Sequence, residues 1–273
     1  MRGNRRKTTL LLLIFAAGVL CALSLTGELL AETASAADFS RKNLPPCPAC
    51  PFGTDWMGRD MLARTLAGLS LSLRVGALTA AASGAVALVL GTAAAARGGW
   101  ADALISWVID LVMGVPHILL IILISLACGR GFWGVTAGVA LTHWTSLARL
   151  VRGEVLRLKE TPWLRMSRRL GVSRSALLRN HLLPHLLPQF LTGVILQFPH
   201  AILHEASVTF LGFGLPPEQP ATGIILEESM AYLTTGRWWL ALFPGLSLVL
   251  LVVLFALIGE RLRLLLSPAA AQE

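Results

Sequence analysis

The chain has 273 residues, of which 55% are hydrophobic and only 14% charged, and its formal net charge is +8. An average soluble domain has roughly 45–50% apolar and roughly 25% charged residues. This composition excludes a disordered chain and a coiled coil, disfavours a water-soluble enzyme, and indicates a protein that lies in a lipid bilayer. A basic chain can bind nucleic acid, but the distribution of the charges along this one favours membrane topology instead.

Six apolar runs predict membrane spans, because a transmembrane helix needs about 20 apolar residues. The first, residues 10–30, follows four basic residues and also resembles a signal peptide that is cleaved near residues 34–36; its length favours an uncleaved span. In the second run, small residues suit a closely packed helix face. The glycines of that face are Gly76, Gly84 and Gly91. The second to sixth runs are, in chain order, residues 75–96, 103–127, 132–148, 190–214 and 238–258.

The charged residues between the runs predict the orientation of the spans. Segment 149–189 carries nine Arg or Lys against two Glu, whereas segment 213–237 carries one Arg against three Glu, and segment 31–73 is balanced. Cytoplasmic loops are enriched in Lys and Arg. The sequence therefore predicts an all-α polytopic membrane protein with six transmembrane helices, with both termini and segment 149–189 in the cytoplasm.

The basic segment 149–189 contains the first family motif. Gly171 is followed, after nine intervening residues, by residues 181–184 (HLLP). This pattern resembles the G-x9-I-x-L-P core of the EAA loop in permease subunits of binding-protein-dependent ABC importers. Two departures from that motif are residues 165–167 (RMS) in place of Glu-Ala-Ala, and His181 in place of Ile.

Further motifs resemble the peptide/nickel group of these permeases, and in particular the C-type partner of a permease pair. They cover roughly residues 50–268. The matching runs are residues 52–60 (FGTDWMGRD) with Arg64, 108–110 (VID) with 115–116 (VP), 205–214 (EASVTFLGFG), 243–245 (FPG) and 258–263 (IGERLR) with Pro268.

The resemblance implies a type I importer permease that divides into a cytoplasmic tip and first helix (1–30), an external segment (31–73), a transmembrane permease core (74–268) and a tail (269–273). It also implies a bacterial inner-membrane location and, as partners, a second homologous permease, two cytoplasmic ATPases and an external substrate-binding protein. The chain has no phosphate-loop motif, so we expect no nucleotide cofactor and no catalysis by this subunit. The residues expected to contact an ATPase are Arg165, Arg168, Leu170, Gly171, Val172, His181, Leu183 and Pro184.

Ionisable side chains inside a membrane are costly and usually face a pathway or a protein partner. His143 and His204 depart from the peptide-type pattern toward the nickel-type one, and neutral imidazole is a good nickel ligand. They are our candidate metal ligands, with nickel or a metal chelate as cargo; His117 and His200 are weaker candidates. Asp110 and Glu205 are assigned to the pathway or its gating.

Several alternatives stay open. The cargo could be a di- or oligopeptide, with both histidines acting as packing residues. An integral membrane enzyme is disfavoured, because the run that begins with His204 and Glu205 lacks the second His of an H-E-x-x-H metal motif. A passive channel is disfavoured, because a channel needs no docking loop. Cys47 and Cys50 are expected to be a disulfide or idle thiols. Asp55, Arg59 and Asp60 are expected to form a structural salt-bridged turn with Arg64, not a catalytic carboxylate pair.

Overall fold

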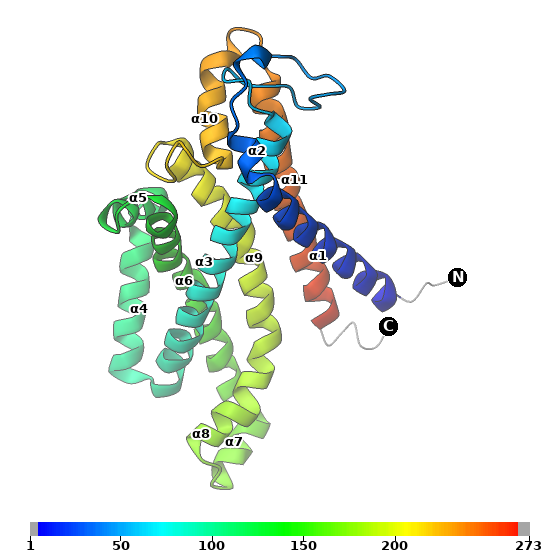
Figure 1. The fold of residues 1–273 in the computed structure, drawn as a ribbon. Coiled ribbons are helices and arrows are strands. Elements are labelled where there is room, and N and C mark those ends of the chain that lie inside the picture. Colours follow the sequence, from blue (N-terminus) through cyan, green and yellow to red (C-terminus); the bar gives the residue numbers. More distant parts are fainter. Residues whose placement is uncertain (1–4, 267–273) are drawn as a thin grey trace.

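The computed structural model describes residues 5–266, and over this range the regular elements are helices, as predicted (Figure 1). Two short helices differ from the α type: η1 is a 3₁₀ helix and η2 a π-helix. The predicted tail 269–273 lies outside the described residues. The elements are α1 (Arg5–Leu29), α2 (Ala31–Ser35), η1 (Phe39–Arg41), α3 (Met61–Arg97), α4 (Gly99–Gly114), α5 (His117–Ala127), α6 (Gly131–Lys159), α7 (Pro162–Arg169), α8 (Arg174–Leu177), η2 (Leu178–Leu182), α9 (Leu183–Phe210), α10 (Thr222–Leu233) and α11 (Trp239–Leu266).

Four helical segments of the described chain are long and apolar enough to cross a membrane: Lys7–Leu29, Met61–Arg97, Leu178–Phe210 and Trp239–Leu266. The pair α4 and α5 is a fifth if it is counted as one span. The remaining predicted span, residues 132–148, lies in α6, which is 29 residues long but is not among the four. Six spans therefore remain a prediction, and α6 is the open case.

The predicted span 103–127 is wrong as one continuous helix. The chain bends by 98° between α4 and α5. Val115 has extended backbone angles (φ −92°, ψ 140°) and is followed by Pro116. Proline disfavours a helical conformation of the residue before it and has no N–H to donate, so the helix ends there. The bend places His117 at the first position of α5.

Close helix packing around α3 confirms the predicted glycine face. A Cβ atom on Gly76 would lie 3.1 Å from Ile202 Cγ1, and one on Gly84 would lie 3.1 Å from Val194 Cγ2, both on α9. A Cβ on Gly91 would lie 2.7 Å from the backbone oxygen of Ala148 on α6. Small residues thus let α3 approach both α6 and α9 in the bundle core.

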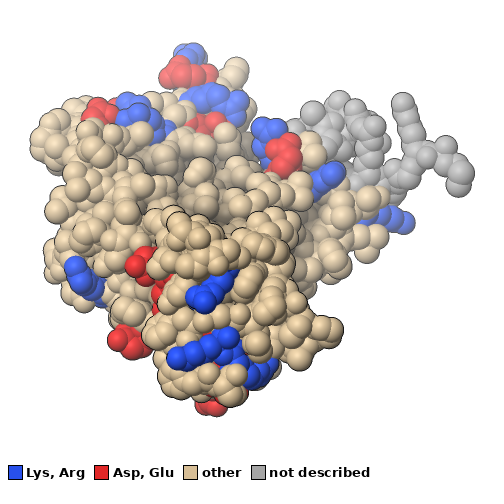
Figure 2. Space-filling view, turned by 90° about the horizontal axis from the view of Figure 1, so that it is seen from above, with Lys and Arg blue, Asp and Glu red and all other residues tan. Residues whose placement is uncertain are grey.

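The two loop regions with different charge lie at opposite ends of the molecule. The segment before α3 and the helices α2 and α10 form the upper end in Figure 1, while α7 and α8 form the lower end. Viewed from above, acidic and basic side chains are mixed, as the balanced composition of the external segment predicts (Figure 2). Many large apolar side chains on α1 and α11 are exposed, which is what helices facing lipid or a partner subunit require.

Candidate functional site

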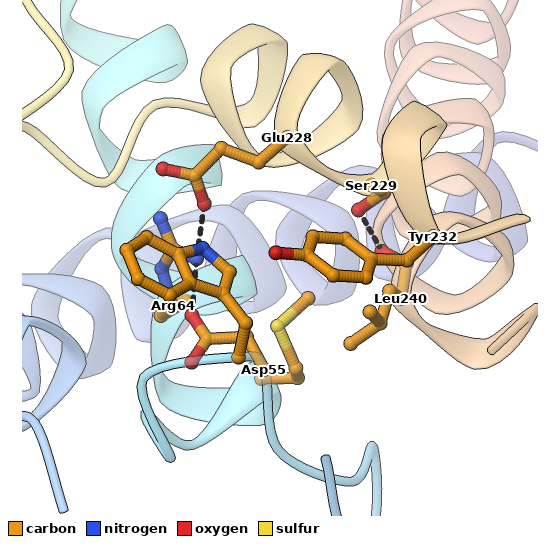
Figure 3. Close-up of a pocket in the computed structure, with 8 residues that line it drawn as sticks. Asp55, Arg64, Glu228, Ser229, Tyr232 and Leu240 are labelled. Carbon is orange, nitrogen blue, oxygen red and sulfur yellow. Dashed lines mark hydrogen bonds and ion pairs between the residues drawn. The ribbon is translucent and has the colours of Figure 1, made fainter. Parts of the chain in front are cut away.

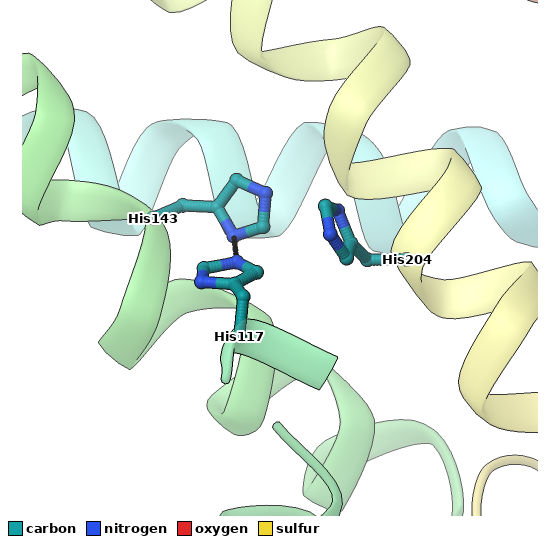
Figure 4. Close-up of side chains that lie close together, drawn as sticks. All are labelled: His117, His143 and His204. Atoms are coloured by element: carbon teal, nitrogen blue, oxygen red, sulfur yellow. Dashed lines mark hydrogen bonds between the residues drawn. The ribbon is translucent and has the colours of Figure 1, made fainter. Parts of the chain in front are cut away.

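The structure brings His143 and His204 together and adds His117, which the sequence ranked lower (Figure 4). One ring nitrogen from each of the three residues can be chosen so that all three lie within 4.8 Å of one another. The ring centroids of His143 and His204 are 5.1 Å apart, and those of His117 lie 4.8 Å from His143 and 4.7 Å from His204. We call these three side chains the histidine cluster.

Each ring of the histidine cluster comes from a different helix. His117 begins α5 after the bend at Pro116, His143 is in the middle of α6, and His204 is in the last third of α9. His143 is buried, whereas the other two are half-buried. The sequence analysis treated residues 103–127 as one span and therefore ranked His117 low. The bend at Pro116 places this residue at the start of α5, beside the other two rings.

Backbone carbonyl groups orient two of the rings. Nδ1 of His143 lies 3.0 Å from the Val139 oxygen, and Nδ1 of His204 lies 2.7 Å from the His200 oxygen. A carbonyl oxygen can only accept, so each Nδ1 carries the proton and each Nε2 keeps a free lone pair. The site therefore presents neutral imidazole nitrogens, which are ligands for divalent transition metals.

Glu205 is fully buried next to the histidine cluster but faces other partners. Its carboxylate accepts hydrogen bonds from the Ser72 hydroxyl on α3 at 2.6 Å and from the Thr209 hydroxyl at 3.0 Å. The carboxylate thus joins α3 to α9. This geometry gives Glu205 a structural role, and the predicted role in the pathway or its gating stays a prediction.

Asp110, the other predicted pathway residue, lies on an exposed side of α4. Its side chain is 69% exposed and pairs with Arg149 of α6 at 2.5 Å. A second pair that the sequence did not indicate joins the same helices, because Arg152 contacts both carboxylate oxygens of Asp102 at 2.5 and 2.8 Å. The two arginines were counted only as topology signals, yet they hold α4 against α6.

The predicted salt-bridged turn in the external segment is present for Asp55, Arg59 and Arg64, and Glu228 of α10 joins it. Asp55 Oδ2 lies 2.6 Å from Arg59 Nε and 2.6 Å from Arg64 Nη1. Glu228 Oε2 lies 2.8 Å from Arg64 and 3.0 Å from Arg59. Asp55, Arg64 and Glu228 border a small pocket with Tyr232 (Figure 3). These ion pairs tie α10 to the external segment and to α3.

Asp60 was predicted to belong to that turn, and this is wrong. Its carboxylate is the N-cap of α3 and accepts from the backbone N–H groups of Leu62 and Ala63. An N-cap acceptor satisfies donors that the first helical turn leaves without a partner. Asp60 therefore starts the helix that carries Arg64.

Cys47 and Cys50 are free thiols in the structure. Cys50 is buried and accepts a hydrogen bond from the Arg41 guanidinium. Burial raises the pKa of the Cys50 thiol, and the neighbouring Arg41 opposes that shift. A raised pKa keeps this sulfur protonated and poorly reactive.

The predicted ATPase-docking segment forms the lower tip of the molecule. Gly171 has a positive φ of 80°, and the Val172 N–H donates to the Ser167 oxygen, as in a helix-ending Schellman motif. Exposed apolar side chains flank this turn, with Leu170 76% exposed. The side chain of Arg168 lies outside the described part. Of the other predicted contacts, Arg165, Val172 and Pro184 are exposed, and His181 and Leu183 are half-buried.

Comparison with known proteins adds an independent line of evidence. A family model described as binding-protein-dependent transport system inner membrane component matches residues 87–272. The dipeptide transport system permease protein of Bacillus subtilis (strain 168) is 30% identical over 84% of this chain and 72% of its own length. A putative peptide transport system permease protein of Brucella abortus biovar 1 (strain 9-941) is 34% identical over 100% of this chain and 90% of its own length.

A solved structure shares the fold. A chain of the MetNI methionine ABC transporter, in an inward-facing conformation, superposes with a TM-score of 0.62 over 76% of this chain and 98% of that chain. The identity is 18%, so this likeness concerns the fold alone.

Proposed function

The chain belongs to the family of binding-protein-dependent transport system inner membrane components, an ABC importer permease family, and we propose that its cargo is a di- or oligopeptide. The observation that carries this proposal is the pair of relatives named for dipeptide and peptide transport, at 30% and 34% identity over most of the chain. This support puts peptides ahead of nickel or a metal chelate, the cargo that the sequence analysis placed first.

The same proposal includes the partners of the complete importer. A second, homologous permease completes the pathway, two ATPases dock on segment 149–189, and a substrate-binding protein docks at the external end. The exposed Leu170 beside the tight turn at Gly171 supports a docking role for the tip. Its location at the end opposite α10 supports cytoplasmic placement of this tip. Cytoplasmic location of both termini is part of the same proposal.

The helix arrangement suggests how ATP-driven motion reaches the pathway. The tip is continuous with α9 through η2, and α6 leads into α7, so a displacement of the tip moves both helices that carry His143 and Glu205. Rocking of such helices between two openings is the usual form of alternating access. No step of this motion needs nucleotide binding by the chain itself.

A metal ion or metal chelate is the second candidate cargo, and one observation favours it. Three imidazole rings from three helices meet at one place, and two of them are half-buried. A transported ion needs exchangeable ligands, and such rings can supply them.

Uptake by cells that express the complete system tests the cargo. We expect accumulation of labelled dipeptide or oligopeptide that an excess of unlabelled peptide abolishes and an excess of Ni²⁺ does not. Accumulation of labelled nickel that peptide does not reduce, with no peptide uptake, would contradict the proposal and support the second candidate.

A variant of the tip tests coupling to the ATPases separately. Leu170→Asp places a charge on the exposed apolar contact and is expected to lower uptake at least about tenfold, because interface cores tolerate charge poorly. The matched control is Leu170→Met, which keeps an apolar side chain at the same exposed position. Equal uptake in the two variants at equal membrane levels would contradict docking at Leu170.

A further inference from the structure

We propose that His117, His143 and His204 bind one divalent transition-metal ion of the Ni²⁺, Co²⁺ and Zn²⁺ class. The proposal goes beyond the proposed cargo, because it concerns an ion held by this chain whether or not that ion is transported. It starts from the convergence of three imidazoles from α5, α6 and α9, with candidate ligand nitrogens within 4.8 Å of one another.

The hydrogen bonds around the cluster are those of metal-ligating histidines. Such residues commonly donate the second ring N–H to a backbone carbonyl or a carboxylate, which fixes the ring and its tautomer. His143 does this with the Val139 oxygen and His204 with the His200 oxygen, each four residues earlier on its own helix. Both Nε2 atoms are thereby left as acceptors without their own proton.

Ordinary packing explains the cluster less well. Over the described residues, one long contact of 3.4 Å, from His117 Nε2 to His143 Nδ1, joins two of the rings, and the rest of the cluster meets edge to face. Among the described residues, the Nε2 atoms of His143 and His204 accept no hydrogen bond, and His117 Nε2 has only long contacts of 3.4 Å with His143 Nδ1 and 3.5 Å with the Thr142 hydroxyl. A cation coordinated by the lone pairs satisfies them together.

Ligand type and number define the class of ion. Imidazole nitrogen suits Zn, Cu, Fe and Ni, whereas Mg and Ca prefer oxygen. Tetrahedral bonds of about 2.1 Å place ligand nitrogens roughly 3.4 Å apart, so nitrogens that now lie within 4.8 Å of one another must approach by up to about 1.4 Å. His117 and His204 are half-buried and can make that movement. Three protein ligands leave a fourth position open to water or to a donor atom of a cargo.

The binding experiment uses the purified permease pair with this full chain, stripped with a chelator and then titrated with Co²⁺, whose visible absorption reports its coordination. We expect one bound Co²⁺ per copy of this chain and displacement by Ni²⁺ or Zn²⁺. His117→Ala and His204→Ala are expected to weaken binding at least about tenfold each, since even removal of a second-shell partner costs 10–100-fold.

The matched control is His185→Ala. His185 is also on α9, and its Nδ1 lies 3.0 Å from the His181 oxygen four residues earlier, but it is remote from the cluster. The test uses His117 and His204, which are half-buried, because replacement of the buried His143 can prevent folding. Gel filtration checks that each variant assembles. Binding retained by the His117→Ala/His204→Ala double variant, or no stoichiometric Co²⁺ binding by the intact chain, would overturn the proposal. Peptide uptake is measured apart from binding, so the two proposals fail independently.

Discussion

The Glu205 carboxylate and the histidine cluster lie on different faces of one turn of α9, since His204 and Glu205 are consecutive residues and point about 100° apart. Glu205 is fully buried and both of its oxygens accept hydrogen bonds from hydroxyl groups of Ser72 and Thr209. The imidazoles of the histidine cluster face one another, and the Nε2 atoms of His143 and His204 have no hydrogen-bond donor among the described residues. A satisfied polar group favours a structural role, whereas acceptors gathered without donors favour a ligand. The neighbours on other helices, not the position along the chain, make this difference.

The largest expected effect is that of removing the carboxylate. Glu205→Ala takes the acceptor away from the buried Ser72 and Thr209 hydroxyl groups and leaves a cavity between α3 and α9, so we expect a loss of about 2–4 kcal/mol in the free energy of unfolding. Thermal unfolding of the detergent-solubilised complex measures it. Glu205→Gln keeps an acceptor of the same shape and should retain most of the stability. An unchanged Tm for Glu205→Ala would contradict the structural role.

Close approach of α3 to α9 beside Glu205 gives the next effect. In Gly76→Val, Cβ would begin 3.1 Å from Ile202 Cγ1 and force the helices apart, and overpacking of this kind costs about 1–3 kcal/mol. Gly153→Ala is the control, because a Cβ there has no heavy atom within 4 Å. The comparison of the two melting temperatures checks the expectation. If both variants melt alike, the glycine face does not limit packing.

Gln197 connects the core to the histidine cluster. Its substitution should therefore have a small effect both on stability and on metal binding. Its side chain donates to the His143 oxygen at 2.9 Å and accepts from the Ser83 hydroxyl at 3.0 Å. We expect Gln197→Leu to lower stability by about 1–2 kcal/mol and to weaken Co²⁺ binding by up to about tenfold. Melting and metal titration on the same preparation measure the two changes. A variant that alters neither quantity would separate the two regions completely.

The smallest effect on stability is expected at the histidine cluster itself. His204 is half-buried, and its hydrogen bond is to a carbonyl of its own helix, so His204→Ala should cost less than about 1 kcal/mol. The same variant should lose metal binding. A drop in Tm as large as that of Glu205→Ala would instead make His204 a packing residue.

Much of the fold and part of the site followed from local sequence. The apolar runs predicted the four strongest spans, and the spacing of Gly76, Gly84 and Gly91 predicted a packed face. The ion pairs of Asp55 with Arg59 and Arg64 were also expected. Each of these depends on residues close in sequence or on the solvent preference of a whole segment, which composition and periodicity carry directly.

The rest depended on which of several available partners a polar side chain meets, and most of these partners are distant in sequence. Glu228 joins the ion pairs from 164 positions beyond Arg64, and His117 joins the histidine cluster only because the chain bends at Pro116. Asp60 looked like a partner of Arg64 but caps α3 instead. A side chain's type does not show which of several nearby or distant groups it will meet.

By itself, then, the sequence determined that this chain is helical and lies in a membrane, because lipid accepts only backbone whose hydrogen bonds are satisfied within helices or closed barrels. It also determined that basic and balanced segments belong to different ends, because cytoplasmic loops are enriched in Lys and Arg. The tertiary structure alone decided which polar side chains meet. It placed His204 among two other imidazoles and Glu205 between two hydroxyl groups, because adjacent residues on a helix point about 100° apart and so contact different neighbouring helices.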